Sequence, residues 1–243
     1  MGTIHVPGAG GAGALRPAIR PRLGVDRVKF RIKTWHRILF LFVWTLLVLY
    51  PNPVRLVSSV VRVLDPPTDP LAVATMLDHV PSDPAELESY VLRTYPYQYD
   101  WVTYGVPWYF PTLEEAMEKG TGDCKTRFVV LASYFEALDI PYTQTFSLSH
   151  FWLIYEGKEE TPMETASNAW LVRDEEGTRL QVPREDRSQI WRVFREAFWD
   201  SMPAVRKGLL LAGLPLSLLL GIPLALLAPA RAPIPARVRR SVG

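Results

Sequence analysis

The segment "GTGDCKTR", residues 120–127, contains the only cysteine of the chain and decides the fold expected around it. Asp123 is a favourable N-cap residue, so a helix is predicted from Cys124 to about Leu138. The glycines before it let the chain turn tightly into that helix. Cys124 then lies in the first turn, where unpaired backbone N–H groups and the helix dipole favour a thiolate. The apolar residues that follow at helical spacing on the same face are Phe128, Leu131, Phe135 and Leu138.

Helix signals precede this segment and strand signals follow it. A cap at Ser82-Asp83-Pro84 predicts a helix before residue 95, and a Thr112/Glu115 capping box predicts a second one that Gly120 ends. After Pro141 the stretches "YTQTFSLSHFWLIYEG" and "AWLVRDEEGTRLQVP" are rich in aromatic and β-branched residues. Helices followed by strands predict an α+β fold, with the cysteine helix packed against an antiparallel sheet.

Charge is strongly segregated along the 243 residues, although the net charge is only +2. Residues 65–200 hold 24 of the 25 acidic residues and 11 of the 27 basic ones, a net charge of 11 − 24 = −13. This segment is not expected to bind nucleic acid by neutralising phosphates. One cysteine and few histidines also make a poor ligand set, so neither a metal nor an organic cofactor is expected.

Two apolar stretches flank the acidic segment. The first, "ILFLFVWTLLVLY" at residues 38–50, is short for a membrane and reaches a sufficient length only if it continues past the proline pair to about Val57, with Arg55 at the interface. A cleaved signal peptide and a buried core helix are the alternatives for this stretch. The second, "GLLLAGLPLSLLLGIPLALLA" at residues 208–228, is 21 residues long without a charge, which is about 31 Å of helix.

These stretches predict a two-pass protein of the cell membrane. Basic residues before the first span and after the second place both termini in the cytoplasm and the acidic domain outside. The expected organisation is a basic arm (1–36), a first transmembrane or interfacial segment (37–64), a linker (65–82), a folded domain (83–200), a second transmembrane helix (206–229) and a basic tail (230–243).

A cysteine nucleophile requires a base and a group that orients the base. His5 and His36 fall in the arm and His79 in the linker, which leaves His150 at the start of a strand. A structural histidine is the alternative interpretation of His150. Of the later acids, Glu164 is expected in an adjacent strand.

The stretch "PTLEEAMEKGTGDCKTRFVVLASYFEALDIPY" (111–142), followed by "SHFW" (149–152) and "PMETAS" (162–167), resembles the core of the transglutaminase-like superfamily, which has a papain-like fold. The resemblance implies that Cys124 is the nucleophile, His150 the general base and acid, and Glu164 the orienting acid. The family more often has Asp at the position of Glu164 and Gly at that of Asp139.

The resemblance implies a membrane-anchored thiol enzyme that acts on amide bonds of proteins or peptides, by hydrolysis or by acyl transfer. Its oxyanion would be stabilised by the Cys124 backbone N–H and by an upstream donor. The donors considered are Gln98, Trp101 and Trp108. The alternative is a catalytically inactive binding or assembly module, or a subunit of a membrane complex whose helices pack against membrane-protein partners.

Overall fold

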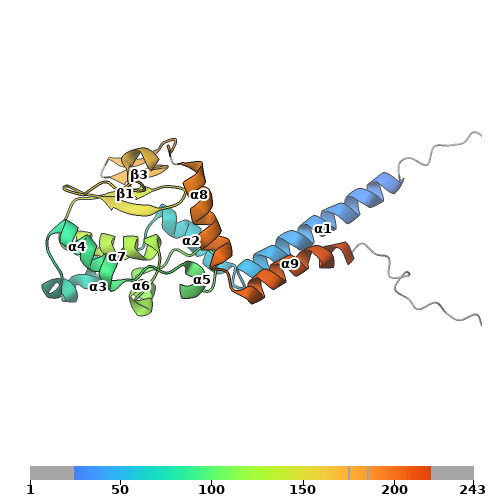
Figure 1. The fold of residues 1–243 in the computed structure, drawn as a ribbon, viewed down its shortest axis with the longest axis horizontal. Coiled ribbons are helices and arrows are strands. Elements are labelled where there is room, and N and C mark those ends of the chain that lie inside the picture. Colours follow the sequence, from blue (N-terminus) through green and yellow to red (C-terminus); the bar gives the residue numbers. More distant parts are fainter. Residues whose placement is uncertain (1–24, 175, 185, 220–243) are drawn as a thin grey trace, which may run out of the picture.

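The computed structural model describes residues 25–174, 176–184 and 186–219, which form an α+β domain with two helices projecting from one side (Figure 1). The predicted α+β class with an antiparallel sheet is confirmed. The elements, in chain order, are α1 (Val25–Leu49), α2 (Val54–Leu64), α3 (Pro70–Val73), η1 (Ala74–His79), α4 (Pro84–Thr94), α5 (Asp100–Thr103), α6 (Leu113–Lys119), α7 (Cys124–Ala137), β1 (Thr143–Phe146), β2 (Phe151–Ile154), η2 (Ala166–Asn168), β3 (Leu171–Asp174), β4 (Gly177–Leu180), α8 (Arg187–Phe194), η3 (Arg195–Asp200) and α9 (Ala204–Leu219).

Helix α7 is the centre of the domain, as the sequence predicts. The Asp123 side chain caps it by accepting from the Lys125 backbone N–H at 2.9 Å. The helix ends one residue earlier than predicted, and Asp139 follows in the left-handed conformation with φ 53°. Helices α3, α4 and α6 and strand β2 all contact α7. More residues of α7 are buried than the single apolar face that the sequence predicts. Those in the main core are Phe128, Val129, Val130, Leu131, Ala132, Tyr134 and Phe135.

The described strands form a four-stranded antiparallel sheet in the order β2-β1-β3-β4. The sheet lies over α7, with β2 in direct contact with that helix (Figure 1). The turn between β1 and β2 is closed by two hydrogen bonds between Ser147 and His150: Ser147 N–H to the His150 carbonyl at 2.8 Å, and His150 N–H to Ser147 Oγ at 3.0 Å. This turn places His150 at the end of β2 that is nearest the start of α7.

The chain turns into α7 through two glycines with different roles. Gly120 ends α6 in the left-handed conformation, with φ 61°, after the predicted Thr112/Glu115 capping box. Gly122 lies so close to Thr126 that a Cβ on Gly122 would overlap the Thr126 side chain. The Gly122 carbonyl also accepts from the Gln98 N–H at 2.9 Å, which ties this turn to the segment before α5.

The domain begins earlier in the chain than the sequence predicts. Residues 65–82, expected to be a linker, contribute the fully buried Val73 to the main core. The Asp69 backbone N–H donates to Ser133 Oγ of α7 at 3.1 Å. In α2, Arg62 donates to the Phe110 carbonyl at 2.8 Å and pairs with Glu115 at 2.9 Å. Both segments are therefore structural parts of the domain.

The proline pair after α1 produces a turn of 76° between α1 and α2. Arg55, predicted at a membrane interface, donates to the Tyr104 carbonyl at 2.8 Å, so α2 packs on the domain rather than extending α1. Within the described residues, no single helix has the length and apolar character needed to cross a membrane. By those criteria alone two bent pairs qualify, residues 34–64 and residues 187–219. Part of the predicted span at 208–228, and the tail, lie outside the described residues.

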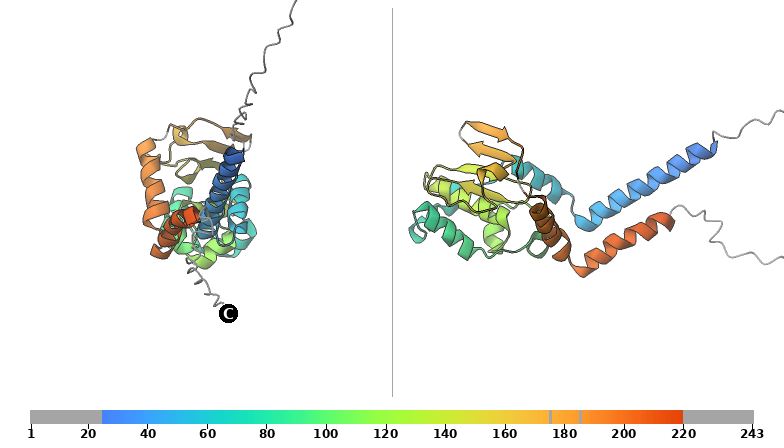
Figure 2. Two further views of the ribbon diagram at one scale, coloured as in Figure 1. Left: turned by 90° about the vertical axis from the view of Figure 1, so that its right-hand side faces the viewer. Right: turned by 45° about the horizontal axis from the view of Figure 1, so that its top comes forward.

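Helices α1 and α9 lie side by side and point away from the domain (Figures 1 and 2). Trp44 Nε1 donates to the Leu209 carbonyl at 2.8 Å, and Arg206 donates to the Val48 carbonyl at 2.6 Å. The Trp44 ring occupies the space that a Cβ on Gly213 would fill. The chain therefore enters and leaves the domain at the same edge.

Replacing Gly122 with Ala should destabilise the domain by about 1–3 kcal/mol, because the new methyl group overlaps Thr126 at a tightly bonded turn. Chemical denaturation measures the change. Gly208→Ala is the matched control, because a Cβ at that helical position meets no atom within 4 Å, and it should not lower stability. Equal effects of the two substitutions would contradict the close approach of Gly122 to Thr126.

Candidate functional site

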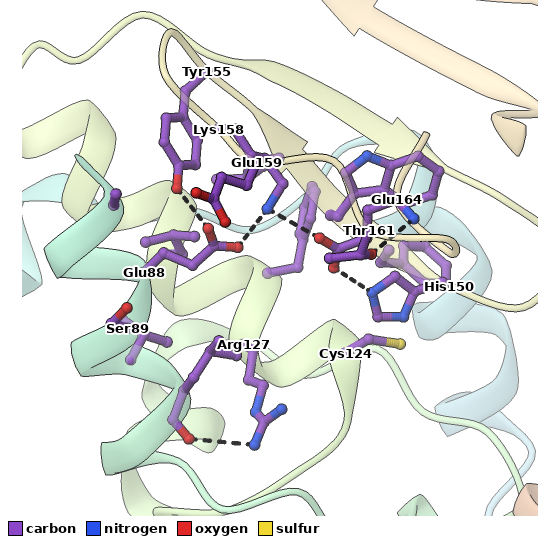
Figure 3. A pocket seen from close by; sticks show the side chains of 18 of the residues that line it. Glu88, Ser89, Cys124, Arg127, His150, Tyr155, Lys158, Glu159, Thr161 and Glu164 are labelled. Carbon is purple, nitrogen blue, oxygen red and sulfur yellow. Dashed lines mark hydrogen bonds and ion pairs between the residues drawn. The ribbon is translucent and has the colours of Figure 1, made fainter. Parts of the chain in front are cut away.

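Cys124, His150 and Glu164 converge at the start of α7, beneath the end of β2 (Figure 3). His150 Nε2 lies 2.8 Å from Glu164 Oε1. The His150 ring lies between Glu164 and Cys124, close enough to Cys124 for the two side chains to influence each other's charge. The structure thus brings together the three residues expected to act as nucleophile, base and orienting acid.

The surroundings of His150 favour its protonated form. Burial alone would lower the pKa of His150, but its contacts with Cys124 and Glu164 and the negative charges of these two groups outweigh it and raise the pKa to about 10. Because folding raises this pKa, protonated His150 stabilises the folded state fully below about pH 6.5, and that contribution is lost as the pH rises towards 10. The protonated imidazole is therefore the favoured form of His150 at neutral pH.

Glu164 lies in the loop between β2 and η2, not in a strand as predicted. Its backbone N–H donates to the Thr161 carbonyl at 3.0 Å, and its Oε2 lies 3.0 Å from Lys158 Nζ. Burial would raise the pKa of Glu164, but the hydrogen bond with His150 and the charge of Lys158 lower it below its usual value. A loop carboxylate is therefore held ionised by a cation that the sequence analysis did not identify.

Lys158 connects this loop to helix α4. Its Nζ pairs with Glu88 at 2.6 Å as well as with Glu164, and its side chain is only 6% exposed. Glu88 in turn accepts from the Tyr155 hydroxyl at 2.5 Å (Figure 3). The resulting network, Tyr155–Glu88–Lys158–Glu164–His150, runs from α4 to the His150 ring. Pairing across 70 residues of sequence leaves no local pattern by which to predict it.

Trp152 restrains the other side of the base. Its ring stacks on His150, with ring centroids 5.9 Å apart and planes 18° apart. Stacking on one face and the hydrogen bond to Glu164 at one edge leave the imidazole little rotational freedom. His150 is therefore held in the orientation that points it at Cys124.

A second ion-pair cluster lies under the residues that flank Cys124. Lys125 Nζ pairs with Asp100 at 2.9 Å and with Asp123, and all three residues are buried. Burial and the charge of Asp123 raise the pKa of Asp100 to about 7, against the lowering effect of Lys125. One oxygen of Asp100 has no hydrogen-bond partner among the described residues. The cluster thus carries two carboxylates for one cation, which keeps the pKa of Asp100 above its usual value.

The three residues considered as oxyanion donors occupy different environments. Trp101 donates its indole N–H to the Phe198 carbonyl at 2.9 Å, and the Gln98 side chain accepts from Thr103 at 3.2 Å. Neither Gln98 nor Trp101 lines a cavity at Cys124 in the described part of the chain. Trp108 does line one, with Lys125 above its ring at 6.0 Å.

Tyr97 is a residue near the nucleophile that the sequence analysis did not consider. It pairs with Gly122 in an isolated parallel bridge and lines both cavities that reach Cys124. Although Tyr97 is 47% exposed, desolvation of its hydroxyl and the charge of Cys124 raise the pKa of Tyr97 well above its usual value, so the phenol keeps its proton and remains a donor. The aromatic run "YPYQYDW" was the available signal, but it does not indicate which ring faces the thiol.

Cys124 lies where two cavities of the described structure meet, and Tyr97 and Phe151 line both of them. The first cavity has a volume of about 540 Å³ and contains the charged side chains of the site. They are Glu88, Arg127, His150, Lys158, Glu159 and Glu164. The second cavity, of about 550 Å³, is lined mainly by aromatic and aliphatic side chains from the end of α1, from α8 and η3 and from the loops near Cys124, and it includes the charged cluster of Asp100, Asp123 and Lys125. A substrate bond held at Cys124 would therefore have a polar environment on one side and an apolar one on the other.

Among the described residues, no cluster of three or more His, Cys, Asp or Glu side chains is arranged to hold a metal ion. Comparisons of the chain with protein-family models, with curated proteins and with solved structures found no match. The chemistry of the site must therefore be argued from its own geometry.

Replacing Lys158 with Met should lower the free energy of unfolding by about 3 kcal/mol, because Glu88 and Glu164 lose a buried cation. It should also raise the pKa of Glu164, since the charge of Lys158 lowers that pKa. Denaturant titration and carboxylate NMR measure the two effects. Lys119→Met, at an exposed position on α6, should change neither; an unchanged Glu164 titration in Lys158→Met would contradict the proposed coupling.

Proposed function

We propose that this chain is a transglutaminase-like thiol enzyme that acts on amide bonds of proteins or peptides, by hydrolysis or acyl transfer. The observation that carries the proposal is the convergence of Cys124, His150 and Glu164, with His150 next to Cys124 and 2.8 Å from Glu164. Helix α7 begins at the cysteine and packs against an antiparallel sheet, with the histidine directly before β2. This arrangement supports a papain-like core, the finer fold class expected from the sequence.

In the proposed reaction, the Cys124 thiolate attacks the amide carbonyl carbon, and an S–C bond forms as the carbonyl oxygen becomes an oxyanion. Collapse of this intermediate breaks the C–N bond, and the nitrogen leaves with the proton of His150. Neutral His150 then takes a proton from water, or from an amine, which attacks the thioester. The S–C bond breaks, and the thiolate and protonated His150 are regenerated. Glu164 keeps the imidazole oriented throughout.

The oxyanion has one donor in the Cys124 backbone N–H, which lies at the start of α7 where helical N–H groups have no intrahelical acceptor. We infer that the Tyr97 hydroxyl is the second donor, in preference to Gln98, Trp101 and Trp108. Tyr97 lines both cavities at Cys124 and keeps its proton, whereas the indole N–H of Trp101 is already used by Phe198.

We also propose that α1 and α9 anchor the domain in the cell membrane, with both termini in the cytoplasm and the domain outside. The charge distribution along the sequence supports this orientation. Large apolar side chains are exposed along both helices, which is costly in water over so large a surface. They include Ile38, Leu39, Phe42, Val43 and Leu47 on α1, and Leu209, Leu211, Leu214 and Leu218 on α9.

The function is tested by the reactivity and turnover of Cys124. Iodoacetamide should alkylate Cys124 at least tenfold faster than free cysteine at neutral pH, and His150→Ala should abolish that advantage, because the imidazolium stabilises the thiolate. The purified protein should release ammonia from glutamine peptides or cleave casein, and Cys124→Ala should lose this activity. His79→Ala is the matched control, since His79 lies in η1, away from the site.

The rival function is a binding or assembly module without turnover, and the low exposure of Cys124, 7%, is the observation in its favour. That function requires a thiol that reacts no faster than free cysteine and is indifferent to His150. Such a result, together with unaltered binding partners in Cys124→Ala, would replace the enzymatic proposal with the rival one.

Because the chain has a single cysteine, thiol labelling of the wild-type protein can measure its orientation in the membrane. A membrane-impermeant maleimide should label wild-type Cys124 in intact cells, because the domain is placed outside. In a Cys124→Ser background, Ser241→Cys in the tail should be labelled only after the cells are permeabilised. The reverse pattern would show that the domain is on the cytoplasmic side.

A further inference from the structure

The second cavity at Cys124 is built from segments at both ends of the domain. Leu49 and Tyr50 at the end of α1 form one wall, and α8 with η3 forms another. Leu148 in the loop before β2 and Phe151 at the start of β2 also line the cavity. The remaining apolar residues of the wall are Pro107, Trp108, Ile190, Trp191, Val193, Phe194, Ala197 and Phe198. A volume of about 550 Å³ is within the range of cavities that hold small ligands.

Most polar side chains of this cavity are already paired with protein groups. The Tyr50 hydroxyl donates to the Trp108 carbonyl at 3.0 Å, and the Tyr99 hydroxyl donates to Glu196 at 3.2 Å. Lys125 is held by its two aspartates. A peptide would bring main-chain N–H and C=O groups that need partners, whereas a hydrocarbon chain would need none. Apart from the one Asp100 oxygen that has no partner among the described residues, the wall therefore fits an occupant without hydrogen-bonding groups.

The position of His150 distinguishes the two halves of a substrate. His150 lines the first, charged cavity and not the second, so the amine to which it gives a proton should leave through the first cavity. The acyl group that stays on Cys124 then extends into the apolar cavity. This arrangement matches an amide that joins an aliphatic acid to a polar amine.

The mouth of the apolar cavity lies beside the proposed membrane anchor. Trp191, Phe194 and Trp199 are exposed on α8 and η3, and Lys207 of α9 lies 5.5 Å from the Trp199 ring centroid. Exposed tryptophans next to a basic residue are typical of segments at a bilayer surface. A cavity that shares walls with α1 and with this aromatic surface is accessible to a chain leaving the lipid phase.

We propose that the second cavity binds the aliphatic acyl chain of a lipid-derived N-acyl amide whose amine belongs to a peptide or protein, and that Val193 and Ala197 limit the chain length. This inference rests on the proposed function of Cys124. The acyl carbon bonds to Sγ, the C–N bond breaks, and the amine leaves with the proton of His150. Water then hydrolyses the thioester to give a fatty acid and restore the thiolate.

Acylation of Cys124 by p-nitrophenyl acetate, butyrate and octanoate tests the inference on the full-length protein in detergent. The leaving group is constant, so the rate of p-nitrophenol release reports the fit of the acyl chain. Relative to free cysteine, the second-order rate constant should rise at least tenfold from acetate to octanoate, because each added methylene is removed from water.

Filling the cavity should remove this preference. Val193→Trp and Ala197→Phe each place a larger side chain in the wall and should reduce the octanoate-to-acetate ratio to that of free cysteine. Arg192→Trp introduces the same side chain at an exposed position of α8 outside the cavity lining, and it should keep the wild-type ratio. The iodoacetamide rate of each variant should equal that of the wild type, which shows that the site is folded.

A chain-length ratio equal to that of free cysteine in the wild type, or one that survives in both filled variants, would overturn the inference. The p-nitrophenyl ester of N-acetyl-leucine, which has the same leaving group, serves as the peptide-like probe. If it acylates Cys124 faster than octanoate and loses that advantage in Val193→Trp, the cavity binds a peptide side chain instead. Failure of the proposed function is distinct, because the iodoacetamide reaction itself would then show no enhancement.

Discussion

The burial of the Lys125 cation between two carboxylates is the constraint on which the rest of the site depends. Lys125 and Asp123 flank the nucleophile in sequence, and Asp100 belongs to α5. An unpaired charge in this position would be strongly destabilising, so the start of α7 cannot move away from α5 without separating the pair. Cys124 is thereby fixed at one point, and the two cavities, the oxyanion donors and the histidine are arranged around that point.

The local parts of the fold were predictable because the signals that specify them are local. Caps at Asp83, Thr112 and Asp123 start helices where the sequence predicts. Asp139 adopts the left-handed conformation that its position after the helix requires. The change from helical signals to stretches rich in aromatic and β-branched residues located the sheet. Each of these features depends on groups within a few residues of one another, and a sequence displays them directly.

The support of the site was not predictable, because it depends on groups distant in sequence. Nothing near Lys158 indicates that Glu88 will be its partner, and the strand expected at Glu164 is a loop held by that pairing. Residues 65–82 read as a linker because of their prolines, yet Val73 packs in the core. The apolar cavity is formed by segments from both ends of the domain, so no single stretch of sequence carries its pattern.

The side-by-side arrangement of α1 and α9 has a consequence for the history of such a chain. Because the polypeptide enters and leaves the domain at one edge, the domain is topologically an insertion into a helical hairpin. A domain inserted in this way can be gained or lost in a single genetic event. Its two ends lie next to each other in space, so α1 and α9 can still pack together when the domain is absent. Leu49 and Tyr50 are the exception, because they lie at the end of the hairpin helix α1 and form one wall of the second cavity. A domain moved without the hairpin would keep Cys124, His150 and Glu164 but would lose part of its proposed selectivity for the acyl chain.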